Sequence, residues 1–146
     1  DVAAVKVGDV ARGQALFEGK GACASCHRVN GKGSRVAPDL SEIGAVRTAA
    51  ILQKTLADPS STMWPINRPV FAITKDGRNI RGRRLNEDTF SVQLMDENER
   101  LVSLLKSDLR ALEISTTSPM PPATKTLSNE EVADVIAYLL SLKGLP

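Results

Sequence analysis

The residues best suited to chemistry lie within five positions of the 146-residue chain, in "CASCH" from Cys23 to His27. This stretch holds both cysteines and the single histidine of the sequence. Thiols and imidazoles bind metals, exchange electrons and form covalent bonds to cofactors. Random placement gives this spacing in on the order of one case in ten thousand, so chance is a poor explanation.

Four kinds of site could explain the motif: a zinc site, a redox-active cysteine pair, a structural disulfide and a covalently attached haem. A structural zinc site needs four ligands, and the cysteines and the histidine supply three. A thioredoxin-like redox pair follows a strand, whereas "GQALFEGKGA" before Cys23 predicts a helix that runs into a glycine loop. A structural disulfide would close a loop too short to add much stability. The spacing C-x-x-C-H is instead typical of covalent haem attachment.

Haem chemistry accounts for this spacing. Each thiol adds to one vinyl group of the haem, so Cys23 and Cys26 would form thioether bonds. His27 follows directly and is placed to bind the iron through Nε2 as the proximal ligand. Because the chain has one histidine, the sixth ligand must be methionine, lysine, water or nothing.

Three methionines are candidates for the sixth ligand. Met120 in "SPMPP" is favoured, because the flanking prolines stiffen its loop and reduce the entropy lost on binding. Met63 lies in a second loop bounded by proline and stays an alternative. Met95 alternates with Val92 and Leu94 and is expected on the surface or edge of a sheet.

The helices that must position these residues are predicted in three places. Residues 9–19 form a helix capped by Asp9, and a second, capped by Thr48, ends before Pro59. The last, up to Gly144, begins with the capping box Ser128–Glu131. Residues 28–46 and 115–126 are expected to be loops.

Residues 69–114 have a different pattern. Apolar and polar residues alternate here, and Asp76-Gly77 is typical of a hairpin turn. We therefore expect a small antiparallel sheet of three to five strands. Its most basic stretch is interpreted as a solvated sheet edge or as a docking surface for an acidic partner, and it contains Arg78, Arg81, Arg83 and Arg84.

Three segments together resemble the class I cytochromes c: "GQALFEGKGACASCHRVNGKGSRVAPDL", "SPMPP" and "LSNEEVADVIAYLLSLK". The resemblance covers the first sixty and the last thirty residues. It implies a helical haem cup (1–68 and 115–146) and hence a mainly α fold in one domain, 1–146. Small cytochromes c of this class carry no sheet in the middle of the chain, so the β segment 69–114, expected from its alternation, would be an insertion. The first and last helices would cross near Gly13, Phe17 and Tyr138. The middle is more loosely similar to haem-binding domains at the ends of large bacterial dehydrogenase-like proteins.

The same resemblance implies roles for further residues. The Pro38 carbonyl would accept from the Nδ1–H of His27, and Met120 would be the distal iron ligand. Apart from the resemblance, Arg35, Arg47 and Trp64 are candidates for pairing with the haem propionates, the alternative being surface side chains without a specific partner.

The resulting functional prediction is a mono-haem electron carrier with bound haem c, which passes single electrons between redox proteins and is not an enzyme. The alternative is a haem ligand sensor or a peroxidase-like protein with a labile sixth ligand. In a third interpretation, the sheet is the functional part: its arginine hairpin recognises a partner, and the haem supplies the electrons. Haem attachment in the family implies a periplasmic or other extracytoplasmic location.

Composition limits the other classes of function. The net charge of +2 does not indicate nucleic-acid binding, and no run of eighteen apolar residues exists to cross a membrane. The beginning, "DVAAVKVGDV", does not have the pattern of a signal peptide, so a mature form or a piece of a longer protein is expected.

Overall fold

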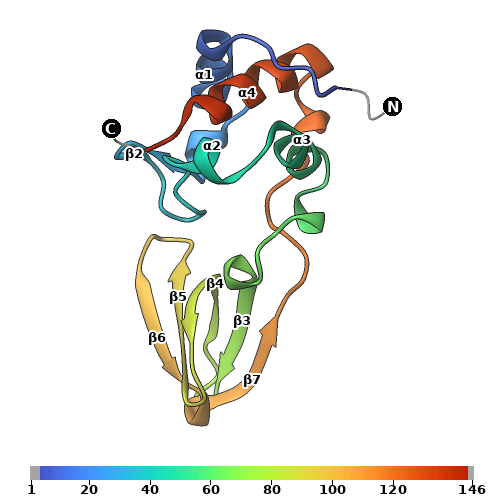
Figure 1. The fold of residues 1–146 in the computed structure, drawn as a ribbon. Helices are drawn as coiled ribbons and strands as arrows, with labels where there is room; N and C mark the ends of the chain where they lie inside the picture. The colour runs from blue at the N-terminus through green and yellow to red at the C-terminus, as the bar shows by residue number, and fades with distance from the viewer. Residues whose placement is uncertain (1–3, 145–146) are drawn as a thin grey trace.

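The computed structural model describes residues 4–144 and divides into a helical part and a sheet (Figure 1). The helical part holds α1 (Val10–Glu18), α2 (Ile43–Val46), α3 (Ala49–Ala57) and α4 (Asn129–Ser141). Among these residues, no helix is both long enough and apolar enough to cross a membrane.

The predicted caps begin the three longer helices. Asp9 accepts from the backbone N–H of Arg12 in α1, and Thr48 accepts from that of Ile51 in α3. Both hydrogen bonds of the capping box between Ser128 and Glu131 are present at α4. Each cap satisfies backbone donors that the first helical turn leaves unpaired, which explains why these positions are visible in the sequence.

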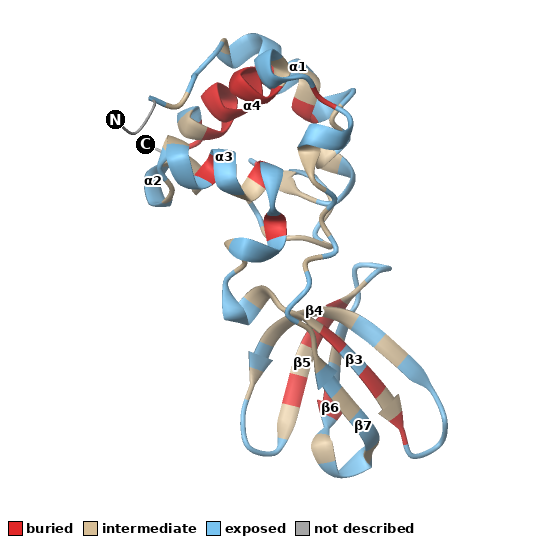
Figure 2. Cartoon of the chain, turned by 90° about the vertical axis from the view of Figure 1, so that its right-hand side faces the viewer, coloured by how far each residue is buried: buried red, intermediate tan, exposed pale blue. Residues whose placement is uncertain are grey.

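Helices α1 and α4 cross as expected from the resemblance. Gly13 lies so close to α4 that a Cβ atom there would be 1.9 Å from the Asp134 carbonyl oxygen. The rings of Phe17 and Tyr138 meet edge to face, with centroids 5.4 Å apart. Figure 2 shows that most of α4 is buried, and its residues form the centre of the helical core.

The segment 28–46 is not entirely loop. It contains a short hairpin of β1 (Arg28–Val29) and β2 (Lys32–Gly33), followed by α2. The two residues between the strands, Asn30 and Gly31, both have positive φ angles, 48° and 83°. Two-residue turns of this kind favour Asn-Gly, which identifies this hairpin in the sequence.

The sheet has five antiparallel strands in the order β6-β5-β4-β3-β7, within the expected number. Its strands are β3 (Pro69–Thr74), β4 (Asn79–Glu87), β5 (Ser91–Asp96), β6 (Leu101–Leu105) and β7 (Leu109–Ile114). One face forms a second hydrophobic core, in which Val70, Val92 and Leu94 are completely buried.

The prediction of a mainly α fold is wrong. Helix accounts for 35% of the residues and strand for 26%, with a five-stranded sheet that has its own core. The error arose because the resemblance covers the two ends of the chain, whereas the strands gather in its middle. The fold combines helices and a sheet in comparable amounts.

Candidate haem site

The CASCH motif lies between the end of α1 and the hairpin β1–β2. Cys23–Ser25 form one turn of 3₁₀-helix, after which the backbone N–H groups of Cys26 and His27 both donate to the Cys23 carbonyl. Cys23 and Cys26 are free thiols, the first half-buried and the second exposed. Both remain available for thioether bonds.

The loop after the hairpin holds the motif in place. The Ala37 N–H donates to the Cys26 carbonyl and the Leu40 N–H donates to the Arg28 carbonyl, each at 2.8 Å. Between them, the Pro38 carbonyl oxygen lies 2.7 Å from Nδ1 of His27. Nδ1 therefore carries the proton in this contact, which leaves Nε2 deprotonated and suited to bind a metal.

The surroundings of His27 favour the neutral imidazole. Burial is the main cause that lowers the pKa of His27, and the positive charge of Arg83 lowers the pKa further, although the Pro38 hydrogen bond opposes both. Burial likewise raises the pKa of the Cys23 thiol. A neutral imidazole is the form that binds iron.

Met120 is the methionine that the fold brings to the same core as Cys23. It is half-buried, packs against the helical core, and has its backbone N–H bonded to the Ser118 hydroxyl. Ser118 in turn donates its backbone N–H to the Ser60 hydroxyl at 2.9 Å, which fastens the "SPMPP" loop to the segment after α3.

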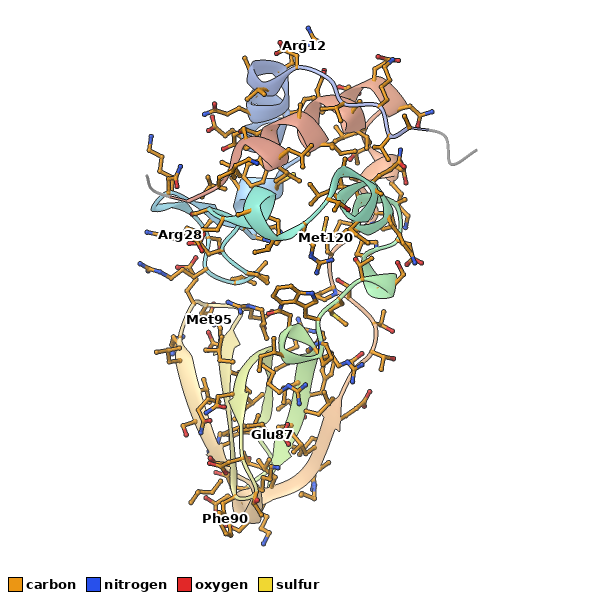
Figure 3. The ribbon with its side chains drawn as sticks, in the orientation of Figure 1. Arg12, Arg28, Glu87, Phe90, Met95 and Met120 are labelled. Carbon is orange, nitrogen blue, oxygen red and sulfur yellow. The ribbon has the colours of Figure 1, made fainter. Side chains whose placement is uncertain are left out.

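The two other methionines differ from Met120 in their surroundings. Met95 belongs to β5, at the end of the sheet nearer to the helices (Figure 3). It is 8% exposed, so the expectation of a surface position is wrong. Met63 is half-buried in the segment that leads to the sheet.

Two of the three propionate candidates lie together. The Arg47 guanidinium carbon is 5.0 Å from the centroid of the Trp64 ring, and this arginine also donates to the Thr62 carbonyl. Arg35 lies on the loop before Pro38, where its backbone N–H donates to Glu99.

The side chains present fit a covalently bound haem. The two free thiols are separated by one helical turn, the adjacent imidazole has its Nδ1 engaged, and a thioether side chain belongs to the same core. These are the donor types found around haem c: cysteine sulfur for attachment, and histidine and methionine for the iron.

The family model described as "Cytochrome c" matches residues 10–107, about two thirds of the chain. The chain belongs to the cytochrome c family. Members bind haem c covalently through thioether bonds, so haem c is the cofactor of this chain, and the family generally carries electrons rather than turning over a substrate. None of the curated proteins matches the chain.

The match to the cytochrome c family includes the CASCH motif and Pro38 but ends before Met120 and α4. The sixth iron ligand is therefore an inference from the packing of Met120 rather than from the family match.

Sequence reasoning missed the contacts between the sheet and the loop that carries Pro38. Arg83 donates to the backbone carbonyls of Val36 at 3.1 Å and Arg35 at 3.3 Å. Ser34, on the same loop, donates its hydroxyl to Glu99 in the turn between β5 and β6, at 2.7 Å. No local pattern signals these contacts, because their partners are 47 to 65 residues apart.

The interpretation of the arginine-rich stretch as a sheet edge is wrong. β4 lies in the middle of the sheet and pairs with both β3 and β5. Three arginines of the basic stretch have carboxylate partners among the described residues: Arg78, in the turn before β4, pairs with Asp76, and within β4 the pairs are Arg81–Glu97 and Arg84–Glu87. Their use as a docking surface for an acidic partner stays a prediction.

Proposed function

We propose that this protein is a mono-haem electron carrier that passes one electron at a time between redox proteins. In this proposal Cys23 and Cys26 hold the haem by thioether bonds, His27 is the proximal iron ligand and Met120 the distal one. The haem supplies the one-electron couple. The observation that carries the proposal is the contact between His27 Nδ1 and the Pro38 carbonyl within a C-x-x-C-H motif.

The chain contributes the position of the imidazole and a half-buried thioether. The turn at Cys23–Ser25 and the loop 37–40 orient the imidazole before any metal binds, which limits reorganisation when the oxidation state changes. The half-buried Met120 thioether favours the reduced iron, because a soft uncharged ligand raises the reduction potential.

The proposal includes a periplasmic or other extracytoplasmic location and redox proteins as partners. Its support is the family, whose domains typically work outside the cytoplasm. Encounters of this kind are brief and use small interfaces.

Three matched substitutions test the ligand assignment: Met120→Leu, Met63→Leu and Met95→Leu. Leucine conserves most of the volume of methionine, so each variant should fold. We expect only Met120→Leu to abolish the weak long-wavelength absorption of ferric haem bound by a thioether, and to lower the reduction potential.

Two outcomes would contradict this assignment. One is a normal long-wavelength band in Met120→Leu, and the other is its loss in either of the two comparison variants. A wild-type holoprotein with a high-spin ferric spectrum would instead favour an open sixth position and the sensor or peroxidase-like function.

A further inference from the structure

Arg83 links the sheet to the loop that holds the proximal histidine. Its guanidinium binds the carbonyls of Arg35 and Val36, and Pro38, two residues further on, holds His27. Arg83 comes from β4, so a side chain of the middle segment reaches the site built by the CASCH motif.

The charge of Arg83 is uncompensated, unlike those of its neighbours on β4. Within residues 4–144 it has no carboxylate partner at ion-pair distance, and its hydrogen-bond acceptors are neutral carbonyls. Arg83 is also partly buried, and this burial lowers the pKa of its guanidinium. A charge withdrawn from water acts over longer distances than an exposed one.

We propose that Arg83 is an electrostatic determinant of the haem reduction potential, through which the sheet favours the reduced iron. This inference rests on the proposed function. Oxidised iron carries one more positive charge than reduced iron, so a nearby cation in a partly desolvated position disfavours oxidation. The sheet thereby contributes a charge that the helical part does not supply at this position.

The test is the midpoint potential of the purified holoprotein and three variants. Arg83→Gln removes the charge, and Arg83→Lys keeps it. Arg81→Gln is the matched control, because Arg81 lies two residues away on β4, is exposed and is paired with Glu97. We expect Arg83→Gln to reduce the equilibrium constant for one-electron reduction about fivefold, or about 40 mV at 59 mV per tenfold change. In Arg83→Lys and Arg81→Gln this equilibrium constant should stay within twofold of the wild-type value.

A second pair of variants covers the case that Arg83→Gln yields no holoprotein. Met95 lies directly opposite Arg83 in the register of β4 and β5. Met95→Glu places a carboxylate beside the guanidinium and should lower the potential, whereas Met95→Gln should not.

Three results would overturn the inference: an unchanged potential in Arg83→Gln, an equal fall in Arg83→Lys, or an equal fall in Arg81→Gln. An unchanged potential in Arg83→Gln would show that Arg83 has no effect on the potential. An equal fall in Arg83→Lys would assign the fall to the geometry of the loop, and an equal fall in Arg81→Gln would assign it to the net charge of the protein. Failure of the proposed function is distinct, because the wild type itself would then have no reversible couple or no methionine–iron band.

Discussion

The helical part and the sheet bury their cores in different ways. The sheet closes its core with its own side chains, and Val70, Val92 and Leu94 are fully buried. In the helical part, Cys23 and Met120 are half-buried at the margin of the core, and Cys26 is exposed. The sheet thus has a core that its sequence completes, whereas the helical core borders the residues that we assign to the haem.

This difference predicts that the two parts depend on the haem to different extents. A bound haem would bury further apolar surface in the helical part, and such burial stabilises a fold in proportion to the area removed from water. The sheet contacts the haem-binding part through the loop 34–36 and through Arg84, which donates to the Pro65 carbonyl, so it should gain less stability from the haem than the helices do.

The largest effect is expected when haem attachment is abolished with Cys23→Ala and Cys26→Ala together. Amide hydrogen exchange in α1, α3 and α4 should accelerate by at least about a hundredfold, because the helical core loses its largest apolar component. Exchange in β3, β4 and β5 should change much less. Ser25→Ala, between the two cysteines, is the control, and equal acceleration in both parts would refute the comparison.

Matched truncations in the two cores come next. Leu94→Ala in the sheet and Ile136→Ala in α4 each remove a side chain that is 0–1% exposed, and each should cost about 2–5 kcal/mol in the free energy of unfolding. We expect Ile136→Ala to perturb the haem spectrum and Leu94→Ala to leave it unchanged. Denaturant unfolding followed by haem absorption and by circular dichroism measures both. The reverse pattern would mean that the sheet core supports the haem.

Gly13→Ala should destabilise the helical part although alanine is the better helix former. Propensity alone predicts a gain of about 1 kcal/mol. The added Cβ, however, would meet the Asp134 carbonyl oxygen at 1.9 Å and Tyr138 Cβ at 2.8 Å, so we expect a net loss of about 1–3 kcal/mol. Ala11→Gly, on the exposed side of α1, measures propensity alone. A stabilised Gly13→Ala variant would disprove the close crossing.

The smallest effect is expected from Asp134→Asn, and it should depend on pH. Asp134 binds the Arg12 guanidinium and the Asp9 N–H, and these contacts lower its pKa below the ordinary value of 3.8. Because the pKa of Asp134 is lower in the folded than in the unfolded chain, its ionised carboxylate stabilises the native state fully above pH 3.8. This stabilisation is lost as the pH falls through the pKa that Asp134 has in the folded state.

Wild type should therefore exceed Asp134→Asn in the free energy of unfolding by a constant amount above that pH, and the difference should shrink in more acidic solution. Glu113→Gln, exposed on β7, removes a carboxylate far from this crossing and is the control for a change of net charge. A difference that persists unchanged into strong acid would mean that the Asp134 charge does not stabilise the crossing.

Features determined by nearby residues were predictable from the sequence. Asp9, Thr48 and Ser128 cap helices because their partners lie three residues away. The CASCH motif and the Asp76-Gly77 turn are also read within a few positions. The Asn30-Gly31 turn carries the same kind of local signal, although the segment 28–46 was expected to be a loop.

Features that depend on distant partners could not be read in this way. The position of β4 between β3 and β5 is set by strand pairing across the whole insertion, so a run of arginines resembled an edge. Alternation placed Met95 on the less buried face but could not show that it would be covered. The contact of Arg83 with Val36 spans 47 positions and follows no sequence period.

The most direct test of the central claim is the mass of the tryptic peptide spanning residues 21–28 from protein produced in a host that attaches haem. This peptide contains both cysteines and His27. We predict that its mass is increased by one haem and that neither cysteine reacts with a thiol reagent. A peptide of bare mass with two reactive thiols would contradict the account.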